Sequence, residues 1–95
     1  MIVQVIKLKS NLSEDNLLKK AKERESQFAA IPGLIQKYYV KLDQPGQYGG
    51  IYVWDSVESM VTFKNSDLAK SIPGAYEVIE APSVEVMDVL FRLRE

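Results

Sequence analysis

Aromatic side chains are concentrated in about a quarter of the chain, between Ile31 and Ser56. Four of the five tyrosines and the only tryptophan lie there. Alternate residues of a strand share a face, so Tyr52 and Trp54 are expected to point to the same side. Aromatic rings can enclose a flat ligand, and a tyrosine hydroxyl or a tryptophan N–H can hold an oxyanion. The candidate substrate-binding residues are Tyr39, Tyr52, Trp54, Met60 and Phe63.

The same residues also have a purely structural interpretation. Tyrosine and tryptophan commonly fill the cores of sheets, and Met60 and Phe63 have the helical spacing of core residues. Tyr38 and Tyr39 point to opposite faces of their strand, so only one of them can line a given cavity. For each ring taken alone, the structural role is favoured over the binding role, and Tyr39, which is chosen from this pair, is a weaker candidate than the other rings.

The chain contains neither histidine nor cysteine. This excludes a Ser-His-Asp triad, a histidine base, a histidine-ligated haem or zinc, a disulfide and a thiolate site. Carboxylates, lysines and tyrosines remain as candidates for proton transfer. Gly46, Gly49 and Gly50 lack the following helix that a phosphate-binding loop needs. We therefore expect no metal, haem, flavin or other cofactor, and no residue demands a catalytic role.

Two polar features have alternative interpretations. Asp88 lies among apolar residues near the end of the chain, where it could be a buried base with a raised pKa. More often such a carboxylate pairs with a cation or lies at the end of a barrel, which is the favoured interpretation. The run Lys22–Gln27 interleaves acids with bases, and a solvated helix face is favoured over a functional basic patch.

The bulk composition predicts one globular domain over residues 1–95, with 46% hydrophobic and 26% charged residues. The net charge of −1 gives no electrostatic reason to expect nucleic acid as a partner. No apolar run approaches the length of a membrane span, and no signal peptide is visible before the first strand. A cytoplasmic location is therefore expected, without a membrane partner.

Periodicity and turn residues predict the order β-α-β-β-α-β. Ser13 is the expected cap of the first helix, and Asp55 with Glu58 resembles a capping box for the second. The fold class is therefore α+β, a ferredoxin-like four-stranded antiparallel sheet with two helices on one face. The expected strands are Ile2–Lys9, Leu34–Leu42, Gly49–Trp54 and Val84–Leu93; the expected helices run over about Glu14–Ala30 and from Val57, with a break at Asn65–Asp67 and an end before Pro73.

The first and last strands carry apolar residues on both faces. In the first strand Ile2, Ile6 and Leu8 share one face, while Val3 and Val5 share the other. Two helices can cover only one face of four strands, so something else must cover the second. A second copy of the same sheet is the simplest cover, and we expect a homodimer that forms an α/β barrel.

Three segments carry a resemblance to a known superfamily: PGLIQKYY at Pro32–Tyr39, GGIYVWDS at Gly49–Ser56, and SDLAK at Ser66–Lys70. They resemble the dimeric α/β-barrel superfamily, and most closely the YdhR-type proteins related to the antibiotic-biosynthesis monooxygenases. The likeness extends over about residues 31–91 and is poor in the first helix. Because the motif belongs to the scaffold, it is more specific for the fold than for the chemistry.

The resemblance implies a function. Members of the wider group oxidise polycyclic aromatic substrates without a metal or prosthetic group, and others degrade haem. The haem degraders use an aromatic residue whose position corresponds to Phe63, and a histidine that would fall near Pro73, where this chain has none. The resemblance therefore favours cofactor-independent oxygenation of a flat aromatic or quinol-like molecule. A non-catalytic ligand-binding protein and a purely structural dimer remain as alternatives.

Overall fold

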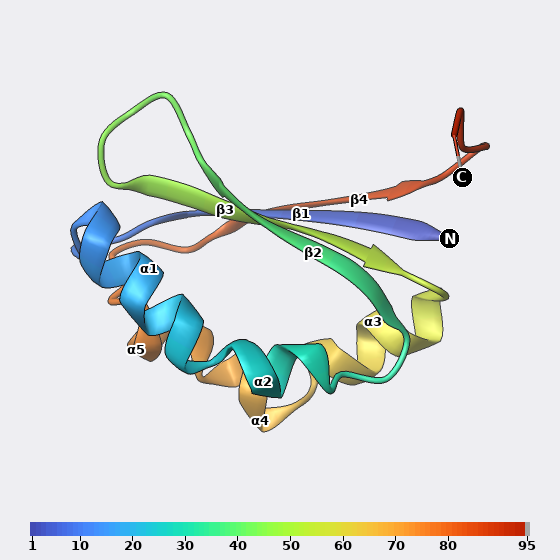
Figure 1. Ribbon diagram of the computed structural model, residues 1–95, viewed down its shortest axis with the longest axis horizontal. Coiled ribbons are helices and arrows are strands. Elements are labelled where there is room, and N and C mark those ends of the chain that lie inside the picture. The colour runs from blue at the N-terminus through green and yellow to red at the C-terminus, as the bar shows by residue number, and fades with distance from the viewer. Residues whose placement is uncertain (95) are drawn as a thin grey trace.

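The protein is described by a computed structural model covering residues 1–94. One antiparallel sheet has the strand order β2-β3-β1-β4, and all the helices cover one of its faces while the other is left uncovered (Figure 1). This confirms the predicted ferredoxin-like α+β fold. The elements are β1 (Ile2–Lys9), α1 (Glu14–Glu23), α2 (Glu25–Ala29), β2 (Leu34–Lys41), β3 (Gln47–Trp54), α3 (Val57–Lys64), α4 (Asp67–Lys70), α5 (Ile72–Ala75) and β4 (Ser83–Asp88).

Both helical segments are more broken than the sequence predicts. The first divides at Arg24, whose φ of −100° and ψ of 0° interrupt the helix between α1 and α2. The second divides into α3, α4 and α5, and Pro73 lies inside α5 rather than after its end. Proline is tolerated there because the first turn of a helix needs no N–H donor from it. The prediction that the helix ends before Pro73 was therefore wrong.

β4 is shorter than predicted. It ends at Asp88, which pairs with Ile2 at the beginning of β1, so no partner strand extends beyond it. The prediction of a strand to Leu93 was wrong for this reason. Leu90 is 92% exposed, and Asp88 is also exposed, which contradicts the interpretation of Asp88 as a buried base.

Serine side chains begin three of the helices. Ser13 Oγ accepts a hydrogen bond from the Asn16 N–H, which confirms the predicted cap of α1. The cap of α3 is Ser56, whose Oγ accepts from the Ser59 N–H at 3.2 Å. Asp55 instead accepts a hydrogen bond from the Ser56 hydroxyl, so the predicted Asp55–Glu58 capping box was wrong.

Gly33 allows the chain to pass close to α3 before β2 begins. Its φ is +82°, and a Cβ built on it would lie 2.1 Å from Ser59 Oγ. A side chain at this position would therefore be both strained and blocked. Because Gly33 O also accepts a hydrogen bond from the Asp55 N–H, this approach joins the beginning of β2 to the end of β3.

β2 contains a β-bulge that changes which residues face the helices. Leu34 pairs with Trp54, whereas Gln36 pairs with Val53, so one extra residue lies between these pairs. Leu34 therefore lies on the helix side and packs against the core, together with Lys37 and Tyr39 further along the strand. Strict alternation along the sequence would place Leu34 on the same face as Gln36 and Tyr38, and this expectation fails because of the bulge.

Two groups of buried side chains lie between the sheet and the helices. The first, which we call the aromatic core, consists of Ile2, Phe28, Tyr52, Trp54 and Phe63. Trp54 is 0% exposed and stacks on Tyr52, with ring centroids 5.9 Å apart and an interplanar angle of 2°. The second group consists of Leu17, Ala21, Tyr48 and Tyr76, under α1 and α5.

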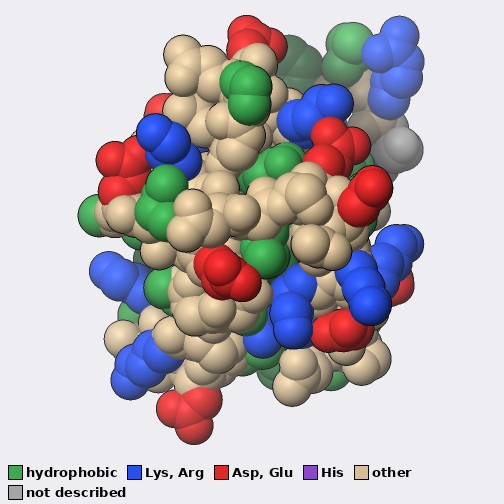
Figure 2. Space-filling model, turned by 90° about the vertical axis from the view of Figure 1, so that its left-hand side faces the viewer, with side chains coloured by type: hydrophobic (Ala, Val, Ile, Leu, Met, Phe, Trp, Pro, Cys, Tyr) green, Lys and Arg blue, Asp and Glu red, His purple; other side chains and the backbone are tan. Residues whose placement is uncertain are grey.

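The remaining surface gives limited functional information. Within the described residues, no helix is long and apolar enough to cross a membrane. Acidic and basic side chains are interspersed on the face shown in Figure 2. The uncovered sheet face carries apolar side chains, including the exposed Tyr38 and Met87 and the partly buried Val3, Val5 and Val53.

Candidate functional site

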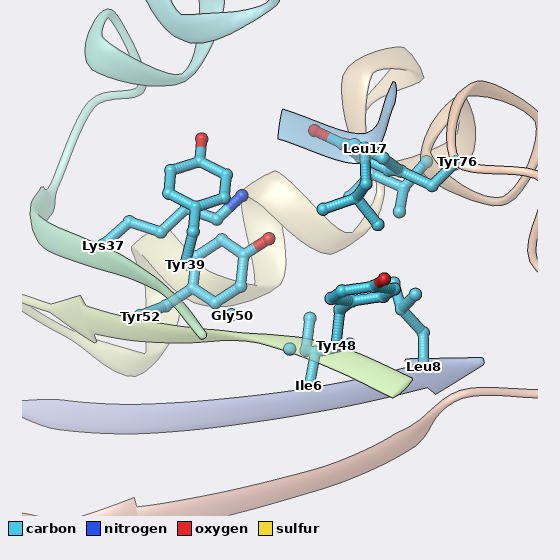
Figure 3. Close-up of a pocket in the computed structure, with 11 residues that line it drawn as sticks. Ile6, Leu8, Leu17, Lys37, Tyr39, Tyr48, Gly50, Tyr52 and Tyr76 are labelled. Carbon is cyan, nitrogen blue, oxygen red and sulfur yellow. The ribbon is translucent and has the colours of Figure 1, made fainter. Parts of the chain in front are cut away.

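A hollow lies between the sheet and the helices beside the aromatic core (Figure 3). Its volume is about 40 Å³, and four of the chain's five tyrosines contribute to its walls. We call it the tyrosine cavity. It is lined by Ile6, Leu8, Leu17, Lys37, Tyr39, Tyr48, Gly49, Gly50, Tyr52, Ile72 and Tyr76.

Gly50 forms the floor of the cavity. A Cβ built on it would lie 2.9 Å from Tyr52 Cε1 and 3.2 Å from Lys37 Cε. The missing side chain therefore allows the Tyr52 ring and the Lys37 stem to lie close against β3. The sequence predicts a bulge or a close approach at Gly49–Gly50, and the close approach is confirmed, while the bulge lies in β2.

Lys37 extends its amino group between aromatic rings at one end of the cavity (Figure 3). Its Nζ lies 3.8 Å from the ring centroid of Phe28, 4.1 Å from that of Tyr39 and 4.6 Å from that of Tyr52. An ammonium is attracted to the negative face of a ring at these distances. The three rings therefore form a cage around this nitrogen.

The charge of Lys37 is poorly compensated. Burial, followed by the nearby positive charge of Arg24, lowers the pKa of Lys37 to about 7. Among the described residues, the ion pairs are Lys20–Glu23 and Lys41–Glu14, and no carboxylate pairs with Lys37. Near neutral pH, Lys37 can therefore both release and accept a proton, which an ordinary surface lysine does not do.

Tyr76 forms the opposite wall of the cavity, and Arg24 packs over its ring without lining the cavity. The buried hydroxyl of Tyr76 and the buried Nε of Arg24 make no hydrogen bond of good geometry within the described chain, although Arg24 is close enough to the hydroxyl to oppose the rise in the pKa of Tyr76 that burial causes. Arg24 does donate through Nη2 to Ser71 Oγ at 2.8 Å, and its guanidinium lies over the rings of Phe28 and Tyr76. Because buried polar atoms are nearly always satisfied in folded proteins, these two atoms indicate a place for a water or a ligand oxygen.

The tyrosine hydroxyls of the site are held in their neutral form. Burial, followed by the neighbouring Tyr76, raises the pKa of Tyr39 to about 12. Burial also raises the pKa of Tyr52 far above its usual range, and it raises that of Tyr76 against the opposing charge of Arg24. At neutral pH these tyrosines can therefore donate hydrogen bonds, but they are poor proton acceptors.

The structure separates the five predicted site residues into two sets. Tyr39 and Tyr52 line the tyrosine cavity, whereas Trp54, Met60 and Phe63 do not. Trp54 and Phe63 are buried in the aromatic core, and Met60 packs against it. Phe63 also lines a separate and larger hollow of about 400 Å³ near Ile31 and Pro32.

The indole N–H of Trp54 is already used within the core. It donates to Gln4 Oε1 at 3.0 Å, and both side chains are buried. The expectation that this N–H is available to hold a substrate oxyanion was therefore wrong. Trp54 instead supports the Tyr52 ring from the side away from the cavity, through the stacked contact described above.

Several residues at or beside the cavity are not among the predicted site residues. Lys37 and Tyr39 share a face at alternate positions, which was a usable signal for Lys37. Arg24 was assigned to a solvated helix face, but it is partly buried against Phe28 and Tyr76 because the helix breaks at this residue. Tyr76 reaches the cavity from a distant loop, and no local pattern predicts such a contact.

Solved structures share this fold. SnoaB, a cofactor-independent oxygenase from Streptomyces nogalater, has a TM-score of 0.77 and 14% identity, covering 99% of this chain and 97% of that chain. A putative antibiotic biosynthesis monooxygenase from Deinococcus radiodurans has a TM-score of 0.74 and 14% identity, covering 100% and 98%. The heme-degrader MhuD from Mycobacterium tuberculosis has a TM-score of 0.76 and 16% identity, covering 98% and 99%.

These likenesses confirm the predicted resemblance at the level of the fold. No family model matches the sequence, and no curated protein sequence matches it. The closer likeness to YdhR-type proteins stays a prediction. Since a fold hosts many activities, the chemistry has to be argued from the cavity itself.

Proposed function

We propose that the chain is a cofactor-independent monooxygenase that acts on a flat aromatic or quinol-like molecule bound at the tyrosine cavity. The observation that supports this proposal is a hollow walled by tyrosines, with a weakly basic amine at one end and the buried Tyr76 hydroxyl at the other. The fold shared with a cofactor-independent oxygenase agrees with it. Such a site binds by shape and stacking and orients its ligand by a few polar groups.

The proposed chemistry needs no electron donor other than the substrate. An anthrone-like substrate loses a proton, and the resulting anion passes one electron to dioxygen. The substrate radical and superoxide then combine and take up a proton to form a hydroperoxide. Loss of water leaves a ketone, so a CH₂ group and O₂ give C=O and H₂O. The protein orients the substrate, excludes water and stabilises the anion.

The resting cavity is too small for this substrate. At roughly 10–15 Å³ for each water, its volume of about 40 Å³ accommodates about three waters. An aromatic ligand therefore requires one wall to move. Tyr39 is the best candidate, because it is 42% exposed on the edge strand β2, whereas Tyr52 is buried. In this proposal Tyr39 and Tyr52 contact the substrate, and Trp54, Met60 and Phe63 hold the Tyr52 ring from behind.

Oxygen uptake with anthrone-like phenols and quinols tests turnover, with the spontaneous oxidation rate subtracted. Ligand binding is followed separately by quenching of Trp54 fluorescence, since Tyr52 lies between this indole and the cavity. Leu17→Phe narrows the cavity and is expected to reduce both signals. Leu18→Phe is the matched control, because Leu18 is exposed on the same helix and does not line the cavity.

The possible outcomes separate the three function classes. Uptake above the spontaneous rate that Leu17→Phe lowers and Leu18→Phe does not would support the proposal. Quenching without uptake would favour a ligand-binding protein with no turnover. If wild-type protein shows neither signal, the structural dimer becomes the better account.

We also propose a homodimer through the uncovered sheet face. This face exposes apolar side chains that the helices of the same chain cannot reach, and a second copy could bury them symmetrically. Light scattering of wild-type protein should show a dimer at micromolar concentration. Val5→Glu, in the middle of β1, should produce monomer, whereas Val61→Glu on α3 should not; a monomeric wild type would contradict the proposal.

A further inference from the structure

Two basic side chains lie near each other beside the tyrosine cavity, where both contact the Phe28 ring. Lys37 comes from β2 and Arg24 from the junction of α1 and α2, and among the described residues neither makes an ion pair. The charge of Arg24 acts on that of Lys37, so the two groups lie close enough to repel each other. Burial and the charge of Arg24 favour the neutral amine of Lys37, and an anion bound beside the two groups would favour the ammonium form.

From this arrangement we propose that Lys37 is the general base of the site and that its ligand is an acidic hydroxyaromatic compound with a second oxygen. The Lys37 amine takes the proton of the aromatic hydroxyl, so that the O–H bond breaks, an N–H bond forms, and a phenolate is paired with an ammonium. The second oxygen accepts a hydrogen bond from the Tyr76 hydroxyl. This inference rests on the proposed function, because it names the substrate class of the same cavity.

The ring cage suits this proton transfer. Before the transfer the amine is neutral, and the apolar rings place little penalty on it. After the transfer, the Phe28, Tyr39 and Tyr52 faces at 3.8–4.6 Å stabilise the ammonium, and the phenolate supplies the missing negative charge. The cage therefore favours the products of the transfer without requiring a carboxylate from the protein.

The titratable and charged groups around Lys37 come from each packed element. Arg24 lies at the end of α1, Tyr39 on β2 itself, Tyr52 on β3 and Tyr76 after α5, while β1 contributes only Ile6 and Leu8 to the cavity. Glu25 of α2 borders an outer hollow next to Lys37 and Tyr39. The tyrosines keep their protons at neutral pH, so Lys37 is the group in this set that can accept one.

Tyr76 and Arg24 define the second anchor. Tyr76 is only 6% exposed, yet its hydroxyl makes no hydrogen bond of good geometry, and it extends toward the Lys37 side from the opposite wall (Figure 3). A plain hydrocarbon would offer no acceptor to this hydroxyl, which costs free energy. A ligand with oxygens at two positions satisfies both ends of the cavity, and this distinguishes it from an unsubstituted polycyclic ring.

The test uses 4-nitrophenol, a single-ring phenol that has acceptor oxygens opposite its hydroxyl and whose phenolate absorbs visible light. Because it is not oxidised in this way, the result does not depend on oxygenation. At about pH 8, most of the Lys37 is neutral and the probe is mainly phenolate, so formation of the ammonium–phenolate pair takes up a proton from the buffer. Calorimetry in two buffers with different ionisation enthalpies measures this uptake.

Three variants distinguish proton acceptance from simple charge. Lys37→Met should weaken phenolate binding by about 10- to 100-fold, because it removes a charge-assisted hydrogen bond. Lys37→Arg should bind the phenolate but take up no proton, since guanidinium is always charged. Lys41→Met is the matched control, because Lys41 lies on the same strand, is exposed and pairs with Glu14. It should behave like wild type.

The proposal is overturned if wild-type protein does not bind 4-nitrophenol, if binding takes up no proton, or if Lys37→Met binds as wild type does. A second measurement avoids variants altogether. Limited acetylation of wild-type protein at neutral pH, followed by peptide mass spectrometry, should modify Lys37 faster than Lys41, and 4-nitrophenol should protect Lys37. Equal rates, or no protection, would also overturn the proposal. Failure of oxygen uptake with intact proton uptake would reject only the oxygenase chemistry.

Discussion

The two ends of the sheet–helix interface are built from similar rings but differ in how they are completed. At the aromatic core, the ring centroids of Trp54, Tyr52 and Phe63 lie 5.4–5.9 Å apart. The indole N–H of Trp54 donates a hydrogen bond to Gln4. At the tyrosine cavity, a space remains, and Tyr76 and Arg24 have unpaired polar atoms.

This difference shows how one small interface serves two purposes. The packed end gains dispersion and hydrophobic free energy from complete contact. The cavity end has less of this packing free energy, because it contains an unfilled space and polar groups without well-aligned partners in the chain. Tyr52 belongs to both ends, since it stacks on Trp54 and also lines the cavity, so a change at one end is transmitted to the other through this ring.

Removal of Trp54 should have the largest effect on stability. Trp54→Ala leaves a void among buried rings and is expected to lower the free energy of unfolding by about 3–5 kcal/mol. Tyr39→Ala, at the exposed edge of the cavity, should cost about 1 kcal/mol or less. Urea denaturation measures both values. Equal costs would show that the two ends are packed alike, contrary to the comparison.

Stability should depend on pH through Lys37. Its pKa is lowered to about 7 in the folded protein, from 10.5, so the unfolded chain binds more protons between these values. The free energy of unfolding therefore rises from pH 7 towards pH 10, by at most about 1.4 kcal/mol per pH unit. Above about pH 10 the buried tyrosines reverse the trend, because the unfolded tyrosines lose protons first.

Lys37→Met tests this pH dependence, because it has no titrating group at position 37. Lys37→Met should be more stable than wild type at pH 7 and should lose the rise with pH, whereas Lys41→Met should retain it. Urea denaturation at several pH values provides the measurement. A wild-type stability that is flat between pH 7 and pH 10 would show that Lys37 is well solvated.

Loss of the buried hydrogen bond between Trp54 and Gln4 should lower the stability of the protein measurably. Gln4→Met preserves the length of the side chain but leaves the buried Trp54 N–H without an acceptor, at a cost of about 1–3 kcal/mol. Gln36→Met, on the uncovered sheet face, should change stability by about 0.5 kcal/mol or less. Thermal denaturation compares the two, and similar small shifts would mean that water satisfies the indole.

The smallest expected effect on stability is that of Tyr76→Phe, which should not destabilise the protein. Tyr76→Phe removes a buried hydroxyl that has no partner, so it should leave stability unchanged or raise it by about 1 kcal/mol. The same variant should weaken 4-nitrophenol binding, because it removes the proposed second anchor. If it lowers stability by more than about 1 kcal/mol, the hydroxyl is bonded in solution and the two ends are equally complete.

Local patterns were sufficient to predict the element order and the shared face of Tyr52 and Trp54. Alternation is a backbone property, and β3 is regular from Gln47 to Trp54. The same rule failed in β2, because one bulge reverses the relation between Leu34 and the residues that follow. Bulges depend on how two strands fit together, so the sequence of one strand does not reveal them.

The cavity was less predictable than the fold because its parts are distant in sequence. Sequence analysis grouped Trp54 and Phe63 with Tyr52 as a single ring cluster, and the structure brings these three together in the core. What it could not predict is that Tyr48 and Tyr76 leave a space next to them. Tyr76 reaches this space from the end of α5, and such a contact depends on tertiary packing rather than on a local pattern.

The bulge in β2 also affects which single-residue deletions this strand can accommodate. Leu34 in the core and Lys37 at the cavity lie on the same side of the sheet. In a regular strand they would lie on opposite sides, because only alternate residues share a face. Loss of a single codon at position 35 or 36 would restore regular pairing and leave both side chains facing the helices. Loss of a codon between Lys37 and Tyr39 would instead turn one of these residues outward. The beginning of this strand is therefore expected to tolerate a length change among descendants of this gene that its middle would not.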